Sequence, residues 1–319
     1  MKWLKFVIAA VVLLFLVLAI LQLDPESLLD AARQIPVWSI ILLFALQILT
    51  QLLVNIQWHQ IAKSFGSTLK FTEILFINAG ADIIHITPGG HISCEVFRAL
   101  KFKDDKEISG EKAAAIVAIQ KLFSLSAFFS ISLISVGFFL SQVPWMQGAG
   151  SQALLYGVMT AILAAFATMF TIPHKILKPL KARWQNPRRL RAFILASLEH
   201  IIYLKSHSKI LIKLLIIAAS IWLLYPAKLY LIAYQLMPDV GVLHIMAITF
   251  LAYTVAVLPI FPGGLGGFEL TMAGLLTLTG FTQAIALVIT IIFRFATFWF
   301  VRLIALVIMG VYKLLKPKK

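Results

Sequence analysis

The chain has 319 residues, of which 61% are hydrophobic and only 13% charged, and its mean hydropathy is +0.95. This composition excludes a soluble globular domain, because only a lipid environment accommodates so much apolar surface. The apolar runs are continuous rather than alternating, which favours helices over a β-barrel. The sequence therefore predicts an all-α polytopic membrane protein with a single transmembrane domain over residues 1–319.

The net charge of +15 has two interpretations. Lys and Arg fall between the apolar runs, as expected from the positive-inside rule and from contact with anionic lipid heads. We therefore expect membrane lipids, and no nucleic acid, as partners. Cys94 is the only cysteine, and the sequence has no CxxC, HExxH or clustered His/Cys/Asp set. No disulfide, metal or other cofactor is expected.

Apolar runs long enough to cross a bilayer predict six full spans. They lie at about 4–22, 36–57, 113–140, 152–172, 211–236 and 283–310. The first begins like a signal peptide but has no A-x-A site before Asp24, so we expect an uncleaved span. Lys2 and Lys5 before it, and the lysines of the tail, predict cytoplasmic N- and C-termini in the cytoplasmic (inner) membrane.

Two further apolar segments, 71–97 and 243–279, are predicted to enter and leave on the same side. The first has Lys and Arg on both flanks, so we expect both of its ends in the cytoplasm. The second lies between loops with almost no charge, so we expect both of its ends outside. Each is predicted to be a re-entrant helical hairpin. With their neighbouring spans they form units at about 36–140 and 211–310, an inverted repeat of the kind found in transporters.

The hairpin tips contain TPGGHISCE at 87–95 and FPGGLGGFE at 261–269. Proline and glycine break a helix, and glycine permits positive φ. The predicted tip residues are Pro88, Gly89, Gly90, Pro259, Pro262, Gly263, Gly264, Gly266 and Gly267. Freed backbone at membrane depth must be buried in protein or line a wet cavity. In such a cavity the backbone amides of the tip can bind a ligand. The positive end of a helix starting near Phe268 can do the same.

Glu95 and Glu269 each lie seven residues after a tip proline. Capping of a helix start is one interpretation. The other is a lipid-headgroup or cavity role, since a charge inside a membrane usually faces a partner or water. Arg98, one turn from Glu95, and Arg294, within the last span, are the predicted partners. Lys121 is a further cavity candidate, with snorkelling as its alternative.

Other polar residues in the apolar runs have simpler interpretations. Asp82 and His85 form either a proton-linked pair or a local structural hydrogen bond. Lys228 lies among tyrosines and is predicted to anchor the chain at the outer interface. No catalytic residue is predicted, because Ser93 and His91 have no recognisable third partner. We expect no enzyme.

The segment 173–210 contains nine Lys and Arg residues against Glu199 alone. They alternate with apolar residues and Trp184, which predicts a basic cytoplasmic helix on the anionic inner leaflet. The alternative is a docking surface for a partner, such as a lipid-modifying transferase.

The tips resemble those of the lysylphosphatidylglycerol synthase transmembrane-region family, which is similar to the N-terminal flippase half of the multiple peptide resistance factor. The resemblance runs over about residues 5–312. The first motif fits with changed spacing, because HISC replaces the usual glycine before the glutamate, and the second fits in register. The matching residues are Pro88, Gly89, Glu95, Arg98, Pro259, Gly263, Gly264, Gly266 and Glu269, with Arg294 at the expected distance.

The resemblance implies movement of a lipid between leaflets, and no soluble aminoacyl-transferase domain follows in these residues. We therefore predict a flippase-like lipid translocase, with Glu95, Arg98, Glu269 and Arg294 as headgroup contacts. No nucleotide-binding motif occurs, so transport would be facilitated or ion-coupled. One alternative is a non-transporting membrane partner that positions a lipid for a separate transferase. Another is a lipid-modifying enzyme.

Overall fold

The structure is a computed structural model that describes residues 25–85, 90–142, 148–171, 173–184, 188–257 and 264–315. These residues are helical apart from short connections, and no strand occurs among them. The predicted all-α fold is confirmed. The predicted span at 4–22 and the tip residues Pro88, Gly89, Pro259, Pro262 and Gly263 lie outside the described residues.

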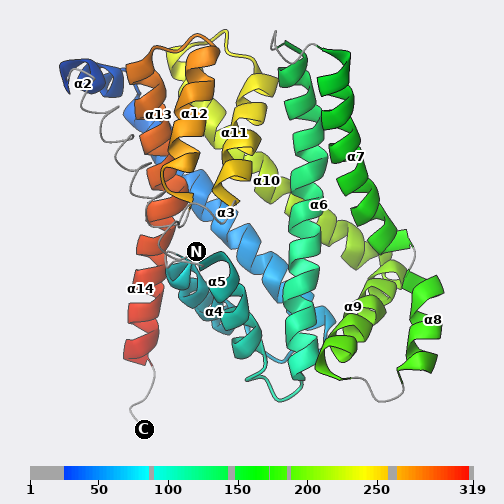
Figure 1. Cartoon of the computed structure of the whole chain (residues 1–319). Coiled ribbons are helices and arrows are strands. Elements are labelled where there is room, and N and C mark those ends of the chain that lie inside the picture. Colours follow the sequence, from blue (N-terminus) through cyan, green and yellow to red (C-terminus); the bar gives the residue numbers. More distant parts are fainter. Residues whose placement is uncertain are drawn as a thin grey trace, which may run out of the picture.

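The helices follow one another with short connections (Figure 1). In chain order they are α2 (Pro25–Arg33), α3 (Val37–Ser64), α4 (Phe71–Ile84), α5 (Gly90–Phe102), α6 (Gly110–Gln142), α7 (Ala149–Thr171), α8 (Pro173–Arg183), α9 (Arg189–Ser206), α10 (Ser208–Leu236), α11 (Val242–Val257), α12 (Gly267–Leu278), α13 (Gln283–Arg294), the π-helix η3 (Phe295–Trp299) and α14 (Phe300–Leu315).

Four described helices are long and apolar enough to cross a membrane. They are α3, α6, α10 and the continuous run of α13, η3 and α14. All four occur where spans were predicted, although α3 continues to Ser64 instead of ending at 57. The predicted span at 152–172 coincides with the helix α7, within which Gln152–Ala165 forms a shorter apolar stretch. By length and composition, the described residues thus support four of the six predicted full spans.

Two pairs of short helices occupy the predicted hairpins. The helices α4 and α5 have 14 and 13 residues and pack on each other, as do α11 and α12 with 16 and 12 residues. Figure 1 shows the two pairs in opposite halves of the molecule, α4 and α5 below and α11 and α12 above. The ends that lead into each connection point towards the middle of the bundle.

The buried apolar side chains form two main clusters, one around each pair. Leu43 of α3 packs with Phe268 of α12 and Phe293 of α13 in the first cluster. Trp58 of α3 packs with Phe102 of α5 and Phe123 of α6 in the second. The long helix α3 contributes to both clusters and joins the two halves.

The sequence predicted one basic helix over 173–210. The structure instead has two helices there, α8 and α9. Helix α9 is docked on the bundle: Ile201 and Leu204 are buried in the second cluster. His200 stacks on Phe65 with ring centroids 3.5 Å apart, and its Nε2 lies 2.9 Å from Ser64 Oγ. Burial lowers the pKa of His200 to about 4, so the imidazole is neutral at physiological pH.

Asp105 joins two loops at the same end of the molecule. Its carboxylate accepts hydrogen bonds from the Ser67 hydroxyl at 2.7 Å and from the Thr68 amide and hydroxyl at 2.8 and 2.9 Å. Partial burial opposes ionisation, but the hydrogen bonds from Ser67, the Glu107 amide and Thr68 outweigh it and hold the pKa of Asp105 at about 2. The α3–α4 connection is thereby fixed to the α5–α6 connection.

Asp105→Ala is expected to lower the free energy of unfolding by about 1.5–3 kcal/mol, because a charged acceptor of several hydrogen bonds is lost. The measurement is thermal unfolding of the purified protein in detergent. Asp104→Ala is the matched control, since Asp104 makes an exposed pair with Lys101 and should change little. The pKa of Asp105 is lowered on folding, so its contribution is present above pH 3.8 and disappears as the pH falls towards 2. Equal melting temperatures for the two variants would contradict this account.

Candidate functional site

Two glycines shape the end of the α11–α12 connection. Gly264 and Gly266 have φ of 73° and 82°, a conformation that side chains other than glycine rarely adopt. A Cβ on Gly264 would lie 2.8 Å from the Cβ of Ala256 in α11. Glycine at this position therefore lets the start of α12 approach α11 closely. The predicted tip residues Gly264, Gly266 and Gly267 stand where the sequence placed them, at the helix start.

Glu269 lies in the first turn of α12 and meets two partners. Its Oε2 accepts the amide of Gly266 at 2.6 Å, and its Oε1 lies 2.9 Å from Nε of Arg294 in α13. Both side chains are buried, with 8% and 6% of their area exposed. Glu269 thus caps the start of the helix through one oxygen and meets its predicted partner Arg294 through the other. We call this contact the Arg294 pair.

Aromatic rings enclose the Arg294 pair. The guanidinium carbon lies 4.5 Å from the ring centroid of Phe268 and 4.2 Å from that of Phe298. Arg294 is the last residue of α13, directly before the π-helix η3. A π-helical turn inside a long helix is rare and often occurs at functional sites. The cation is thus held between a carboxylate and two ring faces, which suits a charge kept away from water.

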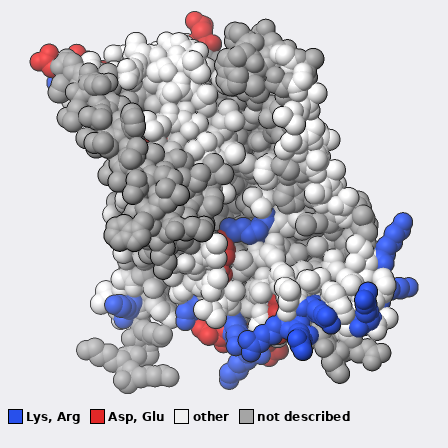
Figure 2. All heavy atoms as spheres, viewed as in Figure 1, with Lys and Arg blue, Asp and Glu red and all other residues white. Residues whose placement is uncertain are grey.

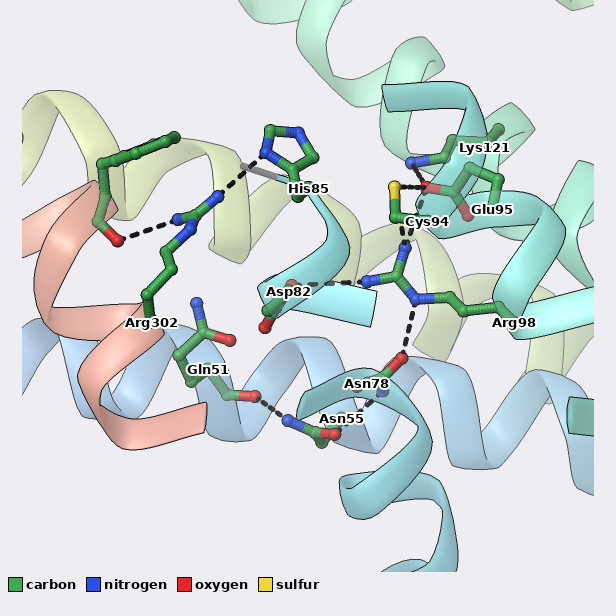
Figure 3. Close-up of polar contacts among 11 residues, drawn as sticks. Gln51, Asn55, Asn78, Asp82, His85, Cys94, Glu95, Arg98, Lys121 and Arg302 are labelled. Carbon is green, nitrogen blue, oxygen red and sulfur yellow. Dashed lines mark hydrogen bonds and ion pairs between the residues drawn. The ribbon is translucent and has the colours of Figure 1, made fainter. Parts of the chain in front are cut away.

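A second charged group surrounds Arg98 of α5, which is buried (Figure 3). Its Nη1 lies 2.9 Å from Glu95 Oε1, and its Nη2 lies 3.4 Å from Asp82 Oδ1 in α4. The predicted Glu95–Arg98 contact is confirmed, with Asp82 as an additional partner. The sulfur of Cys94 contacts both Glu95 and Arg98.

Lys121 of α6 completes this group, with its Nζ 2.6 Å from the same oxygen of Glu95. Lys121 lies eleven residues after the start of α6, which is about 16 Å along the helix axis. The ammonium turns to Glu95, so the snorkelling alternative is not what the structure shows. Lys121 also remains 45% exposed, unlike the enclosed Arg294. We call Asp82, Glu95, Arg98 and Lys121 the Arg98 cluster.

The Arg98 cluster rests on a chain of amides that sequence reasoning missed. Arg98 Nε donates to Asn78 Oδ1 at 2.9 Å, and Asn78 Nδ2 donates to Asn55 Oδ1 at 2.9 Å. Asn55 in turn donates to the backbone of Gln51 at 2.8 Å, in α3 (Figure 3). Asparagines within otherwise apolar helices were the available signal, because a buried amide needs a partner.

Arg302 of α14 is a further buried cation that sequence reasoning missed. Its Nη2 lies 3.0 Å from His85 Nδ1, and its Nη1 donates to the Phe298 carbonyl at 2.9 Å. A guanidinium only donates, so Nδ1 of His85 accepts and the imidazole is neutral. Asp82 and His85, treated as a pair in the sequence, thus face different arginines. The signal was a second arginine eight residues after Arg294 in the same apolar run.

Arg294 and Arg302 also share one aromatic ring. The guanidinium carbon of Arg302 lies 3.8 Å from the ring centroid of Phe298, which Arg294 contacts as well. Phe298 therefore connects the Arg294 pair to the side of the Arg98 cluster where Arg302 and His85 lie.

The prediction for Lys228 was wrong. Lys228 is fully buried. Its Nζ donates to the side-chain oxygen of Gln47 and lies 3.1 Å from Thr50 Oγ1, and both of these residues are in α3. The ammonium also lies 4.2 Å from the ring centroid of Tyr225. The reason is helix rotation: Lys228 lies on the face of α10 that contacts α3. Lys228 joins α3 to α10 and is not an interfacial anchor.

Each charged group borders a groove. Lys121 lines a groove of about 410 Å³ between α6 and α9, whose other walls are mostly apolar. Asp82, Asn55 and Asn78 line one of about 220 Å³ between α3, α4 and α14. Glu269 lines one of about 410 Å³ between α12 and α13. In the described part of the chain, no group of three or more His, Cys, Asp or Glu residues is arranged to hold a metal.

Comparison with known proteins gives the family. The sequence model described as the Lysylphosphatidylglycerol synthase TM region matches residues 2–305. The chain belongs to this family. It is also similar to a UPF0104 membrane protein of Methanothermobacter thermautotrophicus, with 22% identity over 303 residues that cover 88% of each chain. Family and helices together make this a multi-pass membrane protein.

The Arg294 pair predicts a specific pattern of stability. Glu269→Gln leaves a buried arginine without its counter-charge, which should cost about 3–5 kcal/mol. Arg294→Gln in the same chain should recover part of that loss, since no charge is then left alone. Unfolding by denaturant in detergent micelles measures both.

The matched control is Glu73→Gln. Glu73 accepts the amide of Lys70 at 2.7 Å, the same capping position at the start of α4, but it is exposed. Its loss should cost only about 0.3–1 kcal/mol. If Glu269→Gln cost no more than Glu73→Gln, Glu269 would be a helix cap alone.

Proposed function

We propose that this protein translocates a lipid between the leaflets of the membrane, in the manner of a flippase. It would do so without chemical change to the lipid, and hence without acting as an enzyme. The observation that carries the proposal is the position of the charges. Two pairs of short helices reach into the bundle from opposite halves, and a charged group lies close to the inner end of each. A charge at that depth is costly unless it serves a pathway or a partner.

The short helices are re-entrant in this proposal. At 1.5 Å per residue, helices of 12 to 16 residues are about 18–24 Å long, less than the roughly 30 Å hydrocarbon core. Each pair thus enters and returns on one side. The connection of each pair would then lie inside the membrane, where irregular backbone requires protein or water around it.

The two units correspond as an inverted repeat, from α3 to α6 and from α10 to α14. The residues Glu95 and Glu269 are 174 positions apart, and Lys121 and Arg294 are 173 apart. Both cations lie eleven residues into the long helix that follows a short pair. Each binds the glutamate of that pair, at 2.6 and 2.9 Å. The counterpart of Arg294 is therefore Lys121 and not Arg98, which the motif had favoured.

The charge distribution supports an orientation. Figure 2 shows most Lys and Arg at one end of the visible face, where acidic residues also lie, while the charged residues at the opposite end are mainly acidic. A separate group of charged atoms lies about mid-height. By the positive-inside rule the basic end, with α8, α9 and the last turn of α14, would be cytoplasmic. The α4–α5 pair would then enter from the cytoplasm of an inner membrane, and α11–α12 from outside.

The two charged groups differ in exposure, and this difference suggests a transport step. Lys121 is 45% exposed in the basic half, whereas Glu269 and Arg294 are less than 10% exposed in the other half. The structure would then correspond to a state open towards the cytoplasmic leaflet. A movement of the two units that buries Lys121 and opens the Arg294 pair would present a headgroup to the other leaflet.

The proposal is tested by reconstitution in liposomes. The purified chain should speed the loss of a fluorescent phospholipid from the protected inner leaflet, measured by quenching from outside. Glu95→Gln and Glu269→Gln should each slow this at least tenfold, and Lys101→Gln, a control on the exposed side of α5, should not. No lipid movement by the folded native protein would reject the translocase. The protein would then be a partner that positions a lipid for a transferase.

If the two helix pairs are re-entrant, the residues before and after each pair lie on the same side of the membrane. Cysteines at Asp239 and Gln283, before and after the α11–α12 pair, should react with an impermeant maleimide from the same side. Cysteines at Lys70 and Lys103, around α4–α5, should react only after permeabilisation. The background is Cys94→Ser, since Cys94 is buried. Opposite labelling of Asp239 and Gln283 would make α11–α12 an ordinary crossing and end the inverted repeat.

A further inference from the structure

His85 and Arg302 connect the two proposed units (Figure 3). His85 is the C-cap of α4, at the end that leads into the first tip, and Arg302 lies in the first turn of α14. Nη2 of Arg302 lies 3.0 Å from Nδ1 of His85, a contact between residues 217 positions apart. The helices α4 and α14 also pack on each other. This hydrogen bond therefore ties the first tip to the long helix of the second unit.

Arg302 is the fixed side of this hydrogen bond. It is 9% exposed, its Nη1 donates to the Phe298 carbonyl at 2.9 Å, and its guanidinium carbon lies 3.8 Å from the Phe298 ring centroid. A guanidinium does not lose its proton in proteins. The ring nitrogen of His85 must therefore accept the hydrogen bond, and Nδ1 can accept only while it carries no proton.

His85 is the side of the hydrogen bond whose charge can change. Imidazole is the side chain that ordinarily gains or loses a proton between pH 5 and 8. A proton on Nδ1 would turn this atom from an acceptor into a donor that faces a second donor. It would also place two positive charges 3.0 Å apart, next to a buried guanidinium, where they repel strongly. Protonation of Nδ1 and the hydrogen bond to Arg302 thus exclude each other.

Asp82 offers the protonated imidazole another partner. It lies three residues before His85 on α4, and residues at this spacing are neighbours on one face of a helix. Its side chain is 25% exposed, and its Oδ1 lies 3.4 Å from Nη2 of Arg98. Asp82 is also close enough to Arg302 to interact with its charge. Neutral His85 accepts from Arg302, whereas charged His85 would turn to Asp82.

The charged and titratable groups around His85 come from α4 itself and from the helices packed near it. Helix α4 packs on α3, α5 and α14. In the described part of α3, the side chains at this groove are the neutral amides Gln51 and Asn55. Tyr225 of α10 interacts with the charges of Arg302 and Asp82. The full set is Asp82 on α4, Cys94, Glu95 and Arg98 on α5, Arg302 on α14 and Tyr225 on α10.

The groove between α3, α4 and α14 gives a proton a way to this site. Its volume is about 220 Å³, and Asp82, Gln51 and Asn55 line it. Liquid water occupies about 30 Å³ per molecule, so the groove has room for several waters with polar partners. His85 is itself partly exposed. A proton from water can therefore reach Asp82 and, one helical turn further, His85.

We propose that His85 is the proton-binding site of the transport cycle and that its protonation releases α4 from Arg302. This rests on the proposed lipid translocation and names its coupling ion. With neutral His85 the first tip is held to the second unit, as in the structure. With a proton on Nδ1 the two units can move relative to each other, and loss of that proton to water restores the hydrogen bond. One proton is bound and released in each cycle, and no covalent bond of the lipid changes.

The test measures the distance between the two units at two pH values. Spin labels are placed at Thr72→Cys and Gln283→Cys, exposed positions in the first and second unit, in a Cys94→Ser background. The full chain in lipid nanodiscs should show one distance at pH 8. At pH 5.5 a second distance should appear in about half of the molecules or more, since an ordinary imidazole is then mostly protonated.

Three variants separate His85 from other effects of pH. His85→Gln keeps an acceptor for Arg302 but takes up no proton, so it should show the pH 8 distance at both pH values. Arg302→Gln removes the charge that holds His85 and should show the second distance at both. The control His207→Gln changes an exposed histidine and should behave like the native chain. A single distance in the native chain at both pH values, or a pH-dependent distance in folded His85→Gln protein, would overturn the proposal.

The same variants serve in the liposome assay, with equal pH on both sides of the membrane. The native chain should move the fluorescent phospholipid about tenfold faster at pH 5.5 than at pH 8, and His85→Gln should be slow at both. The two proposals fail separately. A pH-dependent distance without lipid movement would keep the proton site and reject the translocase. Lipid movement at one rate at both pH values would reject the proton site and leave the translocase standing.

Discussion

The structure depends on one constraint: a charge inside an apolar helical bundle must have its counter-charge within contact distance. Arg294 meets it through Glu269, and Lys121 through Glu95. Each pair joins a short helix to the long helix that follows, so neither short helix can move far without separating charges. The glycines at the start of α12 serve the same constraint, because they bring the helix start, with Glu269 in its first turn, close to α11. Position, packing and charge are thus set together.

The two charged groups share this plan and differ in their surroundings. The Arg294 pair is packed against Phe268 and Phe298, and less than 10% of either charged side chain is exposed. The Arg98 cluster is larger, rests on Asn78 and Asn55, and keeps Lys121 open beside an apolar groove. In the proposed inverted repeat, this difference would correspond to alternating access, with one half open while the other is closed. Phe298 lies against arginines on both sides, which makes it a candidate for coupling them.

Much of this fold follows from the sequence, because long apolar runs and Pro-Gly breaks act locally. The four long helices, the two short pairs and the Glu269–Arg294 contact were predicted in this way. The failures concern contacts between helices. Lys228 was placed at an interface and Arg302 was overlooked, since both depend on how an apolar helix is rotated against its neighbours. A helix that is apolar on all faces gives little sign of which face is inside. The docking of α9 through His200 could not be predicted either, because it also depends on a contact between helices.

The central claim is that the open charged group at Lys121 receives a lipid headgroup inside the bundle. A density map of the full chain in lipid nanodiscs tests it most directly. We predict a lipid with its chain between α6 and α9 and its phosphate within hydrogen-bond distance of Lys121 Nζ. Lipid density confined to the outer surface of the helices, with the α6–α9 groove empty and Lys121 bound only to Glu95, would contradict the account.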